Sequence, residues 1–227
     1  MEPIRKQWNE RQKLLRQLLV KPETYSEGIE LFLNQHAAVH DSQLSLPAQP
    51  TFEAEIWDGL TEGAARCQPP GEDHSIVWCV WHLARVEDIT LNQLVAGLPQ
   101  VFIREGWQAR LNTHLRDTGN AMPPEYIRQL SREVDLDALR AYRLAVGRAT
   151  REVVSALHPG SRNLKIDNSR LQALLNQGDV RPQAGGLLEY WGGLTINGIL
   201  LMPPTRHSLV HINETVKLKR KCLRGQA

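Results

Sequence analysis

Apolar residues recur every three or four positions over most of the chain, and this spacing predicts amphipathic helices rather than strands. The first helix is expected over residues 4–20, and the second after Lys21-Pro22, running to about residue 41. Their apolar faces consist of Trp8, Leu15, Leu18 and Leu19 in the first and Tyr25, Ile29, Phe32, His36 and His40 in the second. No segment alternates as a half-buried strand does, and no segment is repeated. The pattern therefore favours an all-α fold.

The same periodicity predicts further helices at about 51–65, 75–97, 107–115, 124–131, 135–157, 168–176, 186–199 and 203–221. Asp73 or Ser75 can cap the helix at 75–97, because a short side-chain oxygen accepts bonds from the first free amides. The last helix is expected to begin at Pro203-Pro204, since proline suits a first turn. No shift in composition marks a second domain. We therefore expect one helical domain over residues 1–227, a four-helix bundle with extra helices and long connections.

The charge distribution argues against a nucleic-acid-binding protein. The chain carries 27 basic and 25 acidic residues, for a formal net charge of +2. Five of the basic residues and none of the acidic ones fall within residues 217–227, so the rest of the chain has a net charge of 22 − 25 = −3. A nucleic-acid-binding domain has the opposite balance. The basic tail, residues 217–227, can touch phosphate, but we favour its interpretation as the solvated end of a helix, where cations complement the dipole.

Hydropathy and cysteine usage predict a cytoplasmic protein. No run approaches the roughly 18 apolar residues of a membrane helix, and the charged N-terminus does not resemble a secretion signal. The cysteines, Cys67, Cys79 and Cys222, are few and widely spaced, which argues against a disulfide framework and fits a reducing compartment. Cys79 precedes His82 by three residues and can approach the same site, but we expect it to be a small buried hydrophobe.

Three histidines form a candidate metal site. His207 and His211 lie four residues apart, so a helix projects both imidazoles to one side. His82 shares its helical face with Trp78 and Val86 and is expected to point inward. Three neutral imidazoles suit zinc above all, with nickel, iron, copper or manganese as alternatives. They leave a coordination position open for water or substrate, as in catalytic zinc sites. The HSLVH segment lacks the glutamate of a zincin peptidase.

A second histidine pair rivals the first. His36 and His40 have the same spacing on the apolar face of an early helix, and spacing alone does not choose between the two pairs. If the early pair points inward near His82, it can supply the ligands instead. The interpretation we favour is that these two residues line or cap the bundle near the following loop.

Several segments resemble the DinB/YfiT superfamily of metal-dependent helical proteins. They are SIVWCVWHLARVEDITLN (75–92), the IWDGLTEG segment before it, and PPTRHSLVHINE (203–214). The resemblance covers about 51–97 and 185–218, with a family-specific insertion and the third bundle helix expected between them. It implies a four-helix bundle in which one histidine of the second bundle helix joins an HxxxH pair of the last. On this sequence the implied metal ligands are His82, His207 and His211.

The resemblance implies a fold more narrowly than an activity. Relatives include thiol S-transferases that use glutathione, mycothiol or bacillithiol, metal-dependent hydrolases and maleylpyruvate isomerases. A bound cation can hold a thiol as thiolate or generate hydroxide from water, and the sequence does not select between them. We expect a small-molecule substrate, with a low-molecular-weight thiol as one candidate, and a homodimer formed through exposed helix faces. A non-catalytic metal-binding or stress-response module is the alternative.

Residues beside the predicted ligands have two interpretations each. Glu214 can orient His211 or act as a base, or it can pair on the surface with Lys217. Arg85 and Arg206 can meet an anionic substrate or form surface salt bridges. The tryptophans expected to fill the core rather than to contact substrate are Trp78, Trp81, Trp107 and Trp191.

Overall fold

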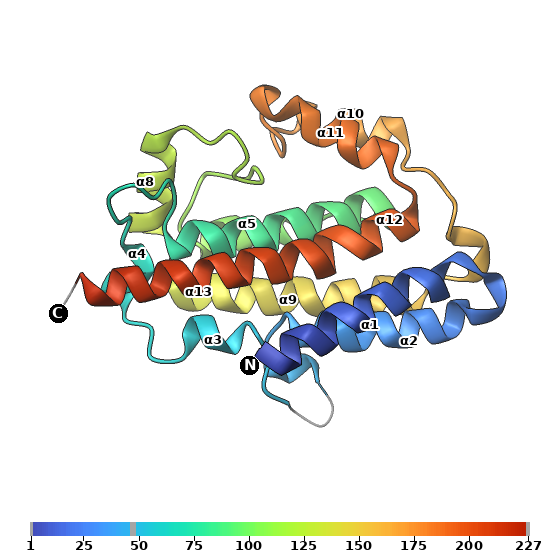
Figure 1. Ribbon diagram of the computed structural model, residues 1–227. Helices are drawn as coiled ribbons and strands as arrows, with labels where there is room; N and C mark the ends of the chain where they lie inside the picture. Colours follow the sequence, from blue (N-terminus) through green and yellow to red (C-terminus); the bar gives the residue numbers. More distant parts are fainter. Residues whose placement is uncertain (1, 46–48, 226–227) are drawn as a thin grey trace.

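The chain folds as a bundle of helices, as the apolar periodicity predicts (Figure 1). The computed structural model describes residues 2–45 and 49–225. The helices of the bundle and its flanks are α1 (Glu2–Val20), α2 (Tyr25–Ala38), α5 (Ile76–Asp88), α8 (Pro124–Glu133), α9 (Leu136–Ser155), α10 (Asn168–Asn176), α11 (Gly185–Gly193), α12 (Ile196–Leu201) and α13 (Ser208–Arg224). Within these ranges no strand forms, and a single antiparallel bridge joins Lys165 to Thr195.

The two helices at the N-terminus pair as an antiparallel hairpin whose buried faces are those expected from the sequence. Trp8, Leu15 and Leu19 of α1 are at most 3% exposed. On the second helix, Phe32 and His36 are fully buried. The hairpin packs on α9 and on the start of the last helical run, so it closes one side of the bundle (Figure 1).

The centre of the bundle is α5, which packs against α9 and α13 (Figure 1). Every residue of this helix is buried, including His82, Arg85, Glu87 and Asp88. Ser75 is its N-cap, because its Oγ accepts a bond of 3.1 Å from the Trp78 amide. Beyond Asp88 the helix continues as a wider π-helical segment, Ile89–Val95. The element expected at 75–97 is therefore present, with a change of helical type that periodicity does not reveal.

Two expected helices are divided in the structure, and a third is shortened. The segment expected as one helix at 51–65 forms α3 (Ala54–Trp57) and α4 (Glu62–Arg66), which are separated where Gly59 adopts a left-handed φ of 64°. The helix expected at 107–115 is shortened to α7 (Trp107–Arg110), and a separate short helix, α6 (Val101–Arg104), precedes it. The segment at 186–199 is split into α11 and α12 because Leu194 is extended and Thr195 caps the second of them.

The last helix does not begin at Pro203-Pro204 as expected. Instead α12, the π-helical segment η6 (Met202–His207) and α13 form one run from Ile196 to Arg224 (Figure 1). The prolines cannot donate to the preceding turn and their rings crowd it. The turn widens there, and hydroxyl groups take up freed carbonyls: Thr205 Oγ1 donates to Leu200 O (2.9 Å) and Ser208 Oγ to Pro203 O (3.1 Å).

The basic C-terminal segment is the last part of α13 as far as Arg224, and residues 226–227 lie outside the described residues. Four of its five basic residues, Lys217, Arg220, Lys221 and Arg224, are exposed as expected of a solvated helix end, and Lys219 is the exception. Lys219 is only 8% exposed and donates to the Glu55 and Asp58 carbonyls, and Lys221 pairs with Glu72. These lysines fasten the end of the helix to the segment that contains α3 and α4.

Candidate metal centre

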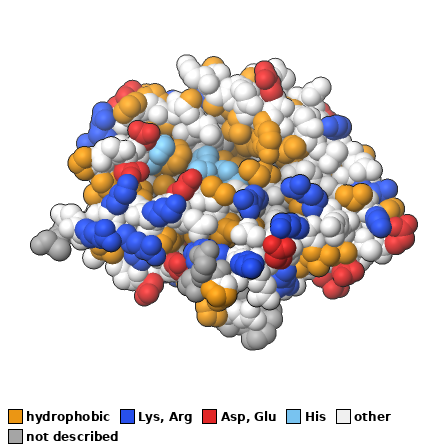
Figure 2. Space-filling model, viewed as in Figure 1, with side chains coloured by type: hydrophobic (Ala, Val, Ile, Leu, Met, Phe, Trp, Pro, Cys, Tyr) orange, Lys and Arg blue, Asp and Glu red, His pale blue; other side chains and the backbone are white. Residues whose placement is uncertain are grey.

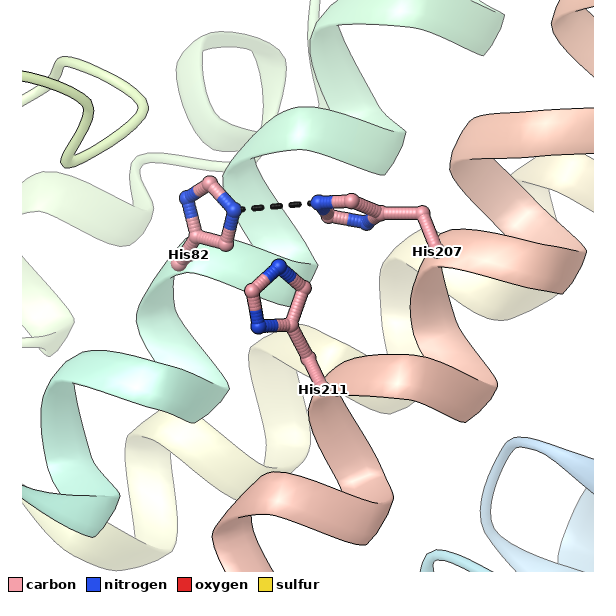
Figure 3. A group of neighbouring side chains, drawn as sticks. All are labelled: His82, His207 and His211. Atoms are coloured by element: carbon pink, nitrogen blue, oxygen red, sulfur yellow. Dashed lines mark hydrogen bonds between the residues drawn. The ribbon is translucent and has the colours of Figure 1, made fainter.

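The triad, His82, His207 and His211, comes together between α5 and the last helical run (Figure 3). His82 Nε2 lies 3.1 Å from His207 Nε2. The ring centroid of His211 lies 4.9 Å from that of His82 and 4.4 Å from that of His207. One ligand atom from each residue lies within 4.8 Å of the other two. Three donors at such spacing can hold a single transition-metal ion.

The other ring nitrogens of two triad members are already occupied. His82 Nδ1 lies 2.7 Å from the Thr118 carbonyl oxygen, to which it donates. His211 Nδ1 lies 2.9 Å from Glu214 Oε2. Each contact fixes the proton on Nδ1 and leaves Nε2 as the lone-pair donor, the arrangement in which metal-binding histidines are oriented by a second hydrogen bond. His207 Nδ1 is buried without a hydrogen-bond partner among the described residues.

The environment keeps the triad neutral. Burial and, to a smaller extent, the neighbouring His211 together lower the pKa of His82 to about 3. Burial is also the main cause of the lowered pKa of His207 and of His211, although Glu214 opposes the effect at His211. Neutral imidazole is the form that binds metal, so no proton has to leave these rings near pH 7. The donor set fits a transition metal better than calcium or magnesium, which prefer oxygen ligands.

The loop at 117–120 packs on α5 and positions His82. Trp81 Nε1 donates to the Asp117 carbonyl (2.9 Å), while the next carbonyl, of Thr118, accepts from His82. Gly119 has a φ of 88°, and a Cβ there would lie 2.9 Å from Trp78 Nε1. A side chain would therefore push the loop away. The Asp117 side chain accepts from the Gly119 amide (2.8 Å) in an Asp-x-Gly turn, a signal that the sequence offered and that the sequence analysis did not use.

Trp78 supports the same imidazole from the side. Its ring stacks on His82, with centroids 4.9 Å apart and an angle of 5° between the planes, and His74 also stacks on Trp78, with centroids 3.7 Å apart. The expectation that Trp78 and Trp81 fill the core is met, since they are 6% and 0% exposed. Both also restrict the position of α5 relative to the loop.

His36 and His40 lie apart from the triad in a second cluster, the buried network. Their Nε2 atoms each lie 2.8 Å from an oxygen of Glu87. The same carboxylate accepts from Arg143 (2.6 Å) and Thr150 (2.8 Å). The side chains of His36, His40 and Glu87 are close enough together to hold a cation. However, the Glu87 carboxylate already accepts four hydrogen bonds, and the positive charge of the Arg143 guanidinium repels a metal ion. The pair therefore lines the interior of the bundle at the end of α2, in line with the interpretation favoured above, but its partner Glu87 was missed by sequence analysis.

The two arginines considered as substrate contacts differ. Arg85 is fully buried and donates to Tyr142, Gln100 and the Arg116 carbonyl, with salt bridges to Asp88 and Asp179. Arg85 therefore neither forms a surface salt bridge nor is available to contact a substrate. Arg206 is exposed and donates to Asn9.

The cysteine nearest to the triad in sequence is a buried hydrophobe, as expected. Cys79 is 7% exposed, and burial raises the pKa of its thiol to about 11.

The triad is reachable from one side of the molecule. His207 and His211 are partly exposed, whereas His82 is 3% exposed. Figure 2 shows histidine side chains in a hollow of this face, bordered by hydrophobic side chains. The triad therefore has a protein side, formed by α5 and its loop, and a solvent side from which a small molecule can approach.

These features define a class: a helical bundle with a histidine cluster between a central helix and the last one. The sequence profile of the DinB superfamily matches residues 54–176, more than half of the 227 residues. The chain belongs to the DinB superfamily. The match includes His82 and ends before His207 and His211. No curated protein matches the chain, and no helix of the described residues is long and apolar enough to cross a bilayer.

Proposed function

We propose that this DinB protein binds a divalent transition metal, zinc in the first place, through the Nε2 atoms of His82, His207 and His211. The observation that supports this most directly is the convergence of three neutral imidazoles, two of which have their Nδ1 atoms held by other groups. The His207 ring has no such second contact, since its Nδ1 is buried without a hydrogen-bond partner among the described residues.

The proposed activity is transfer to, or hydrolysis by, a nucleophile. A divalent cation lowers the pKa of a bound thiol or water and so supplies thiolate or hydroxide at neutral pH. The residues of the chain orient the site: the Thr118 carbonyl fixes His82, and Glu214 fixes His211. Glu214 is largely exposed, with 58% of its side-chain surface accessible. It can therefore also accept the proton that the nucleophile releases.

We further propose that the substrate is a small molecule that enters from the solvent side and, for transfer chemistry, reacts with a low-molecular-weight thiol. Partial exposure of His207 and His211 supports this route. A cytoplasmic location is also proposed, since three free cysteines suit a reducing compartment. We propose in addition that the protein is a homodimer formed through exposed helix faces. Sedimentation at micromolar concentration tests the dimer, and a mass equal to one chain contradicts it.

Metal analysis tests the central proposal. The wild-type protein, reconstituted with zinc and desalted, is compared with the double variant His207→Ala/His211→Ala and with His114→Gln, which alters an exposed histidine outside the triad. We expect about one equivalent of metal in the wild type and in His114→Gln, and almost none in the double variant. Equal metal in all three proteins, or none in the wild type, overturns the proposal.

Turnover is tested separately with the metal-loaded protein. A panel of low-molecular-weight thiols with an electrophile, and a panel of esters and amides, distinguish the two nucleophiles. Activity that is lost in the double variant supports the enzyme. Bound metal without turnover of any of them favours the non-catalytic metal-binding module.

A further inference from the structure

Two of the three cysteines, separated by 155 residues in the chain, meet at the far end of the bundle from the N-terminal hairpin. Cys67 follows α4 directly, and Cys222 lies in the last turns of α13. The Sγ atom of Cys222 lies 3.6 Å from the carbonyl oxygen of Cys67, and the Cys67 side chain packs against the hydrophobic cluster that contains Cys222. Their wide spacing in sequence gave no sign of this contact.

The backbone around the two thiols is held on both sides. Lys219 donates to the Glu55 and Asp58 carbonyls, and Lys221 pairs with Glu72. These contacts tie α13 to the segment on either side of Cys67. Polar contacts that do not involve sulfur thus keep Cys222 against Cys67, as a bridge without large backbone movement requires.

The two thiols differ in access. Cys222 is 1% exposed, and burial, together with the adjacent Cys67 thiol, raises its pKa to about 12. Cys67 is partly exposed and is therefore the thiol that a dissolved oxidant reaches. Cys79 is buried against Thr215 elsewhere on α13 and serves as an internal reference.

We propose that Cys67 and Cys222 form a reversible disulfide on exposure to a hydroperoxide. The Cys67 sulfur attacks the peroxide: an S–O bond forms, the O–O bond breaks, and water leaves, or an alcohol when the oxidant is an organic hydroperoxide. The Cys222 sulfur then displaces the sulfenic oxygen, so that an S–S bond forms and a second water leaves. Two thiols lose two electrons and two protons in all, and the peroxide is reduced. A low-molecular-weight thiol reverses the reaction by exchange.

The bridge would fasten the last helix covalently. A disulfide that closes a loop of 155 residues restricts the unfolded chain strongly, and we expect Tm to rise by roughly 10 °C. Because α13 begins immediately after His207 and contains His211, the bond would stabilise the helix on which two triad members depend.

The test uses the full chain in the presence of a chelator, so that it does not depend on bound metal. Purified protein is treated with a small excess of hydrogen peroxide, and free thiols are counted after unfolding. We expect titratable thiols to fall from three to one, an intact mass lower by two hydrogen atoms, a tryptic cross-link between the peptides of Cys67 and Cys222, and a higher Tm that dithiothreitol reverses. Cys79→Ala is expected to behave as the wild type apart from its missing thiol.

Cys222→Ser is expected to lose both the cross-link and the rise in Tm. The proposal is overturned if peroxide converts Cys67 of the wild type to sulfinic acid while Cys222 stays reduced, or if the cross-link joins two chains. Should Cys222→Ser not fold, the peptide map of the wild type decides by itself.

Discussion

The triad and the buried network share one sequence pattern and have opposite surroundings. Both contain a pair of histidines four residues apart, and both draw a third side chain from α5. In the network that side chain is Glu87, whose charge is balanced by Arg143. In the triad it is His82, so the rings converge on each other without a carboxylate among the converging atoms. Spacing brings imidazoles together, but the charge of the third partner decides what they do.

Solvent access separates the two clusters as well. His36 and His40 are 0% exposed, whereas His207 and His211 reach the surface. Burial alone would raise the pKa of Glu87, but His40, Arg143 and His36 hold it well below its ordinary value. The network is thus a closed ion-pair system inside the bundle, and the triad is an open donor set at its edge.

Replacing Glu87 by Gln is expected to have the largest effect. The amide keeps the shape but removes the charge, and Arg143, which is 1% exposed, loses its closest partner. Breaking a buried pair in this way costs about 3–5 kcal/mol of unfolding free energy, measured by urea denaturation. Glu214→Gln, at an exposed carboxylate, serves as the control and is expected to change stability by less than about 0.5 kcal/mol. Equal midpoints for the two variants would show that Glu87 is not a neutralising charge.

Metal should stabilise the triad and leave the network unaffected. Zinc at 100 times its dissociation constant is expected to raise the unfolding free energy by about 2.7 kcal/mol. The increment should be absent from His207→Ala/His211→Ala. It should survive in His36→Gln, whose side chain contacts Glu87 and not the triad. Thermal unfolding with and without zinc measures it, and an increment lost in His36→Gln instead would place the metal in the network.

The pH dependence of stability distinguishes the network from other acid-sensitive groups. Burial lowers the pKa of His40 from 6.5 to about 3, so this ring is neutral in the folded protein and protonated in the unfolded one below pH 6.5. Its contribution is present above pH 6.5 and is lost as the pH falls toward 3. Between pH 6.5 and 5 the wild type should lose about 2 kcal/mol more than His40→Gln, which cannot take up the proton. Parallel curves from urea titrations would contradict this.

The smallest effect is expected from the carboxylate that contacts the triad. Glu214→Gln keeps a hydrogen-bond acceptor for His211 but weakens it, and metal affinity should fall about tenfold. Competition with a chromophoric chelator measures the affinity. Lys217→Gln, at an exposed neighbour on the same helix, should leave it unchanged. A similar loss in both variants would show that the surface charge acts on the metal rather than the Glu214–His211 contact.

Local signals made much of the fold predictable. Trp8, Leu15 and Phe32 are buried where their periodicity placed them, α10 has the expected bounds of 168–176, and Ser75 caps its helix. These features depend on side chains within one or two turns of each other, and such spacing is visible in a single sequence.

What escaped prediction depends on contacts between distant segments. Three contacts escaped: His82 with the Thr118 carbonyl, His36 with the Glu87 carboxylate, and Cys222 with Cys67. Each joins residues that are at least 36 positions apart in the chain. The convergence of the triad was predicted from the resemblance to a family, because helical spacing did not distinguish His36 and His40 from His207 and His211.

The widened turn at Met202–His207 determines which way the side chains of the last helix point. A π-helical turn accommodates one residue more than the α-helix on either side of it. Deleting a single residue from this turn would restore regular winding and rotate everything after it by about 100° relative to α12. Either His207 and His211 would then face away from α5, or the contacts of Lys219 and Lys221 at the end of α13 would have to break. The extra residue of the π-helical turn thus allows α12 and α13 to keep their own packing contacts within one continuous helical run.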